Sequence, residues 1–294
     1  MKKLAYYIAK LWMYGVAITP FRLLYVRSDF YFLLIYHVAH YRRGVVRQNL
    51  VKSFPDKDLH EVKRIEKAFY HNLCDIFLEV CKLLVIKPED LAKRISFRNG
   101  ELVRQLYDRK KNVFFAFGHY GNWEWFWKLM HQLSDHETVA IYKKLSNPYF
   151  DQLLHEIRTN FHIKGEEAVE SRASLKRLLL RKDRLNSVLI VADQSPQGLP
   201  TDYWTEFLHR DTCWFVGVEK MARMLDYAVV FAEMKRVRRG YYEVTFKLIS
   251  DDVKAEPSGA VMEKYVRSLE SFIIDNPDNW LWSHRRWKHE RNGF

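Results

Sequence analysis

The chain alternates short apolar runs with longer stretches in which apolar residues recur every three or four positions. The uncharged runs at 113–117, 138–142 and 187–191 have the length and content of buried strands, and 227–234 is a further strand. Residues 241–249 alternate in polarity and predict an antiparallel return strand. Helical spacing marks 60–84, 123–130, the segment from 148 onward, 171–180, 213–225 and 258–274. This alternation predicts an α/β fold with a mostly parallel central sheet flanked by helices.

The first 45 residues differ from the rest. Two uncharged runs, 11–21 and 30–41 (with neutral histidines), are separated by Arg22, Arg27 and Asp29. Neither reaches the ~20 residues needed to span a bilayer, and no cleavage site for a secretory signal is visible. Interspersed basic and aromatic residues favour a helical membrane-associated segment, 1–45, lying in or dipping through an interface. A soluble helical subdomain capping the core is the alternative. Residues 46–294 contain no linker and are expected to form one domain.

Composition narrows the class of protein. The 294 residues are 48% hydrophobic and 29% charged, which excludes a disordered chain and a polytopic membrane protein. The net charge of +12 indicates an anionic partner: nucleic acid, an anionic membrane, a phosphorylated lipid or an acidic carrier protein. The 15% aromatic content fits a lipid interface and also single-stranded nucleic acid. Three basic residues, Arg236, Arg238 and Arg239, are expected in a solvated turn.

The cysteines give no sign of a metal site. Cys74, Cys81 and Cys213 have no metal-ligand spacing, and the first two fall on one face of one predicted helix. We expect them to pack in the core. Their small, odd number suits a reducing compartment.

The most informative segment is 118–124, where a predicted strand ends and a helix begins. His119 lies at that strand end, the edge at which open α/β sheets bind ligands. Gly118 and Gly121 on either side allow close approach of backbone or substrate. Glu124, in the first helical turn, could hold one ring nitrogen of His119 and leave the other to take a proton from a hydroxyl. The alternative is an acid placed there only for the helix dipole.

Asp193 also follows a buried strand and would share this edge with His119. It could position a substrate hydroxyl or support a basic residue, or simply form the turn before Ser195-Pro196-Gln197-Gly198. The sequence lacks His-Glu-x-x-His, Gly-x-Ser-x-Gly and phosphate-binding glycine loops. Zinc hydrolysis and a serine acyl-enzyme are therefore disfavoured.

Taken together, these segments resemble a known family. His-x-x-x-x-Asp/Glu is the signature of the glycerolipid acyltransferase superfamily, and the string from His119 to Glu124 is similar to its lipid A branch, the late lauroyl and myristoyl transferases. The resemblance spans roughly residues 40–290. Its other blocks come in the family's order: Arg47-Gln48-Asn49-Leu50 with Ser53-Phe54-Pro55, Tyr142-Lys143-Lys144 with Asn147-Pro148, Ala192-Asp193-Gln194, and Trp282-Ser283-His284-Arg285-Arg286-Trp287.

The resemblance implies a fold like that of glycerol-3-phosphate acyltransferase and attachment to the cytoplasmic face of the bacterial inner membrane. It implies transfer of a fatty acyl chain from an acyl carrier protein thioester to a hydroxyl of a phosphorylated lipid A precursor. No cofactor beyond the thioester, no metal and no nucleic acid would be needed.

The resemblance also assigns roles. His119 would be the general base and Glu124 would orient it, while Arg158 would bind an anionic group or support the thioester oxyanion. Gly121, Asn122 and Asp193 would bind substrate or support the site. From the residues themselves, His284-Arg285-Arg286 within Trp280–Trp287 mixes cations with indoles and could bind lipid phosphate or cap the fold through cation–π contacts.

Two alternatives stay open. The acceptor could be another glycolipid, aminolipid or pigment lipid, because His209-Arg210-Asp211-Thr212 departs from the family pattern near the expected acceptor region. Outside the enzyme class, the chain could be a basic protein that binds membranes or nucleic acid.

Overall fold

The computed structural model describes residues 2–161, 163–196 and 203–291. Within them, seven strands form one sheet in the order β1-β9-β8-β2-β5-β3-β4, and β6 and β7 form a separate hairpin. All neighbours in the sheet are parallel except β8 and β9. The strands are β1 (Ile95–Arg98), β2 (Val113–Phe117), β3 (Glu137–Tyr142), β4 (Glu167–Glu170), β5 (Asn186–Val191), β6 (Tyr203–Phe207), β7 (Arg210–Trp214), β8 (Ala228–Arg238) and β9 (Tyr241–Ser250).

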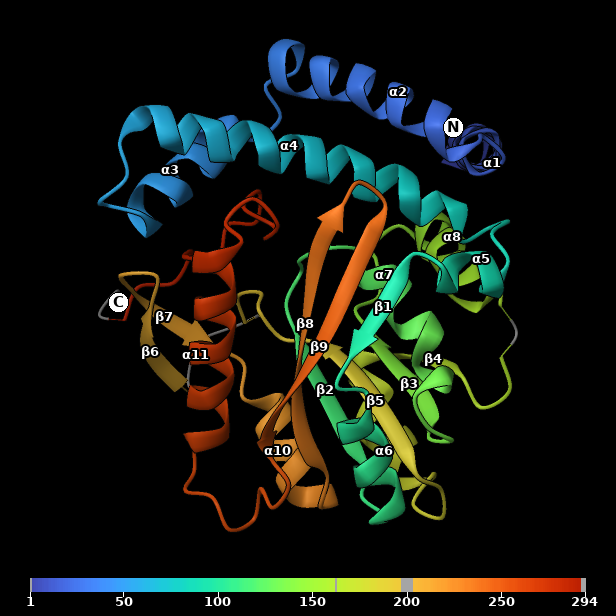
Figure 1. The fold of residues 1–294 in the computed structure, drawn as a ribbon, viewed down its shortest axis with the longest axis vertical. Coiled ribbons are helices and arrows are strands. Elements are labelled where there is room, and N and C mark those ends of the chain that lie inside the picture. Colours follow the sequence, from blue (N-terminus) through green and yellow to red (C-terminus); the bar gives the residue numbers. More distant parts are fainter. Residues whose placement is uncertain (1, 162, 197–202, 292–294) are drawn as a thin grey trace.

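Helices cover the sheet, and one group of them crosses the end to which β8 points (Figure 1). Because β2 runs parallel to β8, this is also the carboxyl end of β2. The helices are α1 (Lys2–Ala17), α2 (Phe21–Phe32), α3 (Arg43–Ser53), α4 (Leu59–Lys82), α5 (Pro88–Ala92), α6 (Glu101–Asp108), α7 (Trp123–Phe126), α8 (Pro148–Thr159), α9 (Ser174–Leu179), α10 (Gly217–Leu225) and α11 (Ala260–Asp275), with a π-helix at Leu33–Val38 and 3-10 helices at Trp127–Gln132 and Ser171–Ala173.

The predicted α/β fold and mostly parallel sheet are confirmed. The apolar runs at 113–117, 138–142 and 187–191 form β2, β3 and β5, and β9 returns antiparallel to β8 as expected. Every residue of β2 is buried, because this strand lies inside the sheet and is covered on both faces. The helix start at Asn147 is also confirmed, since its side chain accepts a hydrogen bond from Tyr149 N.

Several predicted boundaries were wrong. The helix expected over 213–225 begins only at Gly217, because residues 210–214 pair with β6. The sequence prediction also missed the edge strands β1 and β4, which are four residues long and partly polar. Such short strands carry almost no periodic signal. Of the turn expected after β5, at Ser195-Pro196-Gln197-Gly198, positions 197 and 198 lie outside the described residues.

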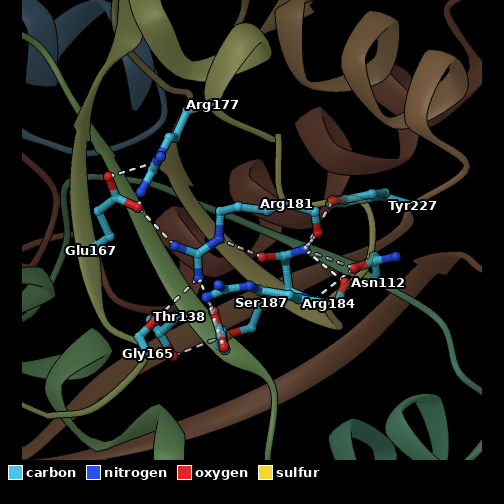
Figure 2. A network of polar contacts seen from close by, with 11 residues as sticks. Asn112, Thr138, Gly165, Glu167, Arg177, Arg181, Arg184, Ser187 and Tyr227 are labelled. Atoms are coloured by element: carbon cyan, nitrogen blue, oxygen red, sulfur yellow. Dashed lines mark hydrogen bonds and ion pairs between the residues drawn. The ribbon is translucent and has the colours of Figure 1, made fainter. Parts of the chain in front are cut away.

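The amino ends of the strands are closed by a polar network, shown in Figure 2. The buried Arg181 donates to Glu167 at 2.7 Å, to Glu137 at 2.7 Å and to Asn186 at 2.9 Å. Glu137, Glu167 and Asn186 are the first residues of β3, β4 and β5. The network therefore fixes the ends of three strands and leaves the opposite, carboxyl edge as the place for a site.

The N-terminal segment packs on α4 and also exposes apolar side chains. Val16 and Leu24 are buried against Leu78 and Cys81 of α4. Among the described residues, no helix combines the length and apolar character required to cross a bilayer. The exposed apolar residues of the segment are Leu4, Tyr7, Ile8, Leu11, Tyr14, Ile18, Leu23, Val26, Phe30, Leu33, Leu34, Val38 and Tyr41.

The expected solvated turn of arginines was wrong for Arg236 and Arg239, whereas Arg238 is exposed. β8 continues to Arg238, and Arg236 and Arg239 both bind the buried carboxylate of Asp75 on α4, at 2.6 and 2.7 Å. Arg239 also binds Asp29 of α2 at 2.6 Å. An anion removed from water needs counter-charges, so these arginines fasten the hairpin to the two helices.

Replacing Asp75 tests this fastening. Asp75→Asn leaves Arg236, whose side chain is 11% exposed, without its carboxylate. Since breaking a buried ion pair strands a charge, we expect the free energy of unfolding to fall by about 3 kcal/mol. Urea unfolding in detergent solution measures it. Asp90→Asn, which removes an exposed pair with Lys93, is the control and should change little. Equal stability of the two variants would contradict the role of Asp75.

Candidate active site

His119 lies in the loop that joins β2 to α7, at the carboxyl edge of the sheet. The loop needs glycine at position 121, where φ is +56° and an added Cβ would lie 3.0 Å from the Met234 carbonyl oxygen. The C-terminal segment, residues 276–291, packs against the loop. Tyr120 forms a β-bridge with Trp280, and Leu281 N donates to His119 O at 3.0 Å.

The carboxylate that holds His119 belongs to Asp193, which follows β5. His119 Nδ1 lies 2.6 Å from Asp193 Oδ1, and the backbone N of His119 donates to Oδ2 at 2.8 Å. Trp280 Nε1 donates to the same Oδ2 at 2.7 Å. On the other side of the ring, Gln194 Nε2 lies 3.3 Å from His119 Nε2. This pattern fits a neutral ring with its proton on Nδ1 and an accepting Nε2.

Asp193 is 2% exposed. Burial alone would raise the pKa of this carboxyl, but the electrostatic interaction with His119 and the hydrogen bonds from His119 and Trp280 outweigh burial and lower the pKa below its usual value. An ionised carboxylate on Nδ1 stabilises a positive ring and makes Nε2 a better proton acceptor.

Glu124 does not hold His119, contrary to expectation. Its carboxylate forms a two-point pair with Arg158 of α8, through Arg158 Nε at 3.0 Å and through Nη2. The guanidinium also lies 5.2 Å from the centre of the Tyr142 ring. A permanent planar cation matches a carboxylate better than a neutral imidazole does, which explains the exchange of partners. The site thus contains two pairs, His119–Asp193 and Glu124–Arg158.

Asn122 is fully buried and supports the loop. Its Oδ1 accepts from Trp125 N at 3.2 Å and starts α7, while its Nδ2 donates to Glu79 Oε2 at 2.9 Å. Glu79, on α4, also accepts from Tyr242 at 2.6 Å and from Tyr25 of α2 at 2.9 Å. Burial raises the pKa of Glu79. Sequence reasoning missed Glu79, although an acid within the apolar stripe of a helix is a usable signal.

The family assignment rests on comparison with known proteins. The family model described as bacterial lipid A biosynthesis acyltransferase matches residues 1–289. The chain belongs to this family. Among curated proteins, none matches the chain at a significant level. The resemblance noted in the sequence is therefore confirmed, and the family implies acyl transfer to a lipid A-type acceptor. Within the described residues, no cluster of three His, Cys, Asp or Glu side chains could hold a metal ion.

The C-terminal block of this acyltransferase borders the site. His284 Nε2 accepts from Ser195 N at 3.3 Å, two residues beyond Asp193. Arg286, expected to contact lipid or cap the fold, is 1% exposed and donates to Cys213 O at 2.7 Å, so it packs inside. Arg285 is exposed. His284 was considered from the sequence only as part of a lipid-phosphate or capping block, and the contacts of His284 with Ser195 and of Trp280 with Asp193 were not foreseen.

The pH dependence of stability tests the His284 contact. Burial lowers the pKa of His284 to about 4, below the value of about 6.5 in an unfolded chain. Its contribution to stability is therefore complete above about pH 6.5 and is lost as the pH falls toward 4. Between pH 7 and 5 we expect the unfolding free energy of the wild type to fall by about 1 kcal/mol more than that of His284→Gln, after allowance for partial exposure. Urea unfolding measures these free energies, and an equal fall for the wild type and His284→Gln between pH 7 and 5 would contradict this prediction.

Proposed function

We propose that this acyltransferase moves a fatty acyl chain from acyl carrier protein to a hydroxyl of a lipid A precursor, with His119 as general base. The observation that carries the proposal is the His119–Asp193 pair, which leaves Nε2 as a proton acceptor at the sheet edge. The acceptor oxygen forms a bond with the thioester carbonyl and gives its proton to Nε2. The C–S bond then breaks, and the proton passes to the departing thiolate.

In this mechanism Asp193 is a positioning residue. It keeps the proton on Nδ1 and stabilises the imidazolium that forms, as a buried carboxylate does for the histidine of serine proteases. Glu124 acts through Arg158, which it holds at two points. We assign Arg158 to an anionic group of the donor or to the developing oxyanion.

The test is an acyl-transfer assay with purified full-length protein in detergent micelles. Acyl carrier protein loaded with chains of different length is supplied with a tetra-acylated lipid A precursor, and products are weighed by mass spectrometry. The wild type should add one acyl mass. His119→Ala should lower kcat by about 10²–10⁴-fold, and Asp193→Asn by a similar factor because the wrong ring tautomer is favoured.

Controls separate the two carboxylates. Asp183→Asn, an exposed aspartate near the amino ends of the strands, should behave as wild type. Asp193→Asn should move the acidic limb of the pH–rate profile, since that limb reports the imidazole, whereas Glu124→Gln should lower the rate without moving it. A His119→Ala variant that keeps most of its rate would refute the mechanism. If the wild type acylated another lipid but not the lipid A precursor, the proposed acceptor would be wrong and the other lipid would take its place.

We also propose that residues 1–45 lie on the cytoplasmic face of the inner membrane, with residues 46–294 as the acyltransferase domain. The exposed residues Leu4, Ile8 and Leu11 recur at helical spacing in α1, and the exposed Ile18 follows directly after the helix. Arg22 and Arg27 are exposed beside the apolar side chains of α2. Apolar side chains flanked by cations are typical of a helix lying in an anionic lipid interface.

Vesicle binding tests this placement. Leu11→Asn/Ile18→Asn replaces side chains that are 77% and 70% exposed, so folding should be preserved. Because the two side chains can no longer be buried in lipid, we expect the affinity for vesicles containing phosphatidylglycerol to fall about tenfold, as measured by the protein that sediments with the vesicles. The control Leu180→Asn/Met224→Asn removes side chains that are 67% and 62% exposed elsewhere. Equal effects of the two pairs would contradict a specific N-terminal contact.

A further inference from the structure

A basic groove of about 770 Å³ lies between α3, the β6–β7 turn and the residues that follow His284. Its volume is that of a site for a small molecule or head group. Lysine and arginine outnumber the acids in its lining, and the residues that matter below are Lys52, Arg210, Arg285, Trp287 and Lys288. The groove therefore presents positive charge in a hollow rather than on a flat surface.

Arg210 lies in the groove and forms no ion pair with any residue that the structure describes. Its Nη2 donates to Ser53 Oγ at 2.8 Å, and its guanidinium lies 3.1 Å from the centre of the Trp287 ring. Its Nε is buried and has no hydrogen-bond partner, and no carboxylate of the described residues lies within ion-pair distance. Burial and the nearby Arg286 lower the pKa of Arg210 to about 10. A desolvated arginine in this state is a ready site for an added anion.

The groove is joined to the site through the backbone. Arg285 and Lys288 follow His284, whose ring accepts from Ser195 N, and Ser195 Oγ donates to the carbonyl oxygen of Arg286. On the other side, Asn49 of α3 donates to Trp282 O and His284 O at 2.9 and 3.1 Å. In Figure 1, α3 lies beside this C-terminal segment, at the end of the molecule that carries α1 and α2.

We propose that this groove binds a phosphate group on the head group of the lipid acceptor, with Arg210 at its centre and Lys52, Arg285 and Lys288 around it. The inference rests on the proposed function, because it places the acceptor head group next to His119. Phosphate suits the site because arginine binds phosphate oxygens in a planar, multi-point manner, and lysines add point charges. A hollow of this size accommodates a sugar phosphate, whereas an acidic protein surface would meet it only at its rim.

The test measures lipid binding to full-length protein in detergent micelles. Lys52→Gln/Lys288→Gln removes two exposed groove charges and leaves the buried framework intact. Lys176→Gln/Lys182→Gln removes two exposed lysines outside the groove and is the matched control. The probes are a tetra-acyl diglucosamine lipid with phosphomonoesters and the same lipid after phosphatase treatment, and calorimetric titration gives the Kd.

We expect the groove variant to lose about tenfold in affinity for the phosphorylated lipid and almost nothing for the dephosphorylated one. The control should match the wild type. Inorganic phosphate should compete with the phosphorylated lipid in the wild type, which identifies phosphate as the recognised group. In the acyl-transfer assay, the KM for the phosphorylated acceptor should rise about tenfold with kcat nearly unchanged.

Three results would overturn the proposal. The wild type could bind both lipids equally, the control could lose as much as the groove variant, or phosphatidylglycerol vesicles could compete as well as the phosphorylated glycolipid. The binding titration needs no acyl donor. Absence of acyl transfer by the wild type would therefore refute the proposed function. The comparison of Kd values would still show whether the groove binds the phosphorylated lipid.

Discussion

The buried carboxylate of Asp193 is the contact on which the site depends. It accepts from the backbone and ring of His119 and from the indole of Trp280, so one side chain joins the ends of β2 and β5 to the C-terminal segment. A buried anion is tolerated only where donors surround it. The same three donors that stabilise the charge of Asp193 in the interior also fix the His119 ring. The hydrogen bonds that stabilise the loop are therefore also the ones that orient the imidazole.

A second buried carboxylate, Glu79, extends this constraint to the N-terminal helices. It binds Asn122 of the His119 loop, Tyr242 of β9 and Tyr25 of α2. Arg239 adds a link between α2 and the β8–β9 hairpin through Asp29. The segment proposed to touch the membrane is thus hydrogen-bonded to the loop that carries His119, by way of a single acidic side chain. Since Tyr25 and Asn122 share that acceptor, movement of α2 would be felt at the start of α7.

The sequence predicted the parts of the fold that depend on local pattern. The buried runs of β2, β3 and β5 have strand length and no charge, and His119 and Asp193 each come two positions after the end of one of them. The partner of His119 was predicted wrongly because spacing favours a residue five positions away over one 74 positions away. Only the adjacency of β2 and β5 in the sheet brings Asp193 to the ring. Likewise, nothing local tells that Arg236 and Arg239 meet Asp75 from another element.

The two ends of the sheet have different roles, one structural and one at the candidate active site. At the amino ends, Arg181 satisfies the first residues of three strands and closes that edge. At the carboxyl ends, the polar groups are arranged around a histidine nitrogen that accepts, with basic side chains in a groove nearby. Helices α1 and α2, which carry exposed apolar residues, lie at this second end (Figure 1). A lipid held by its chains at an interface and by an anionic head group in the groove would present its hydroxyl between them, at His119. Burial of apolar chains, charge pairing and proton transfer would then act on one molecule from three adjacent surfaces, which explains why the basic residues, the aromatic helices and the histidine loop occur in one compact chain.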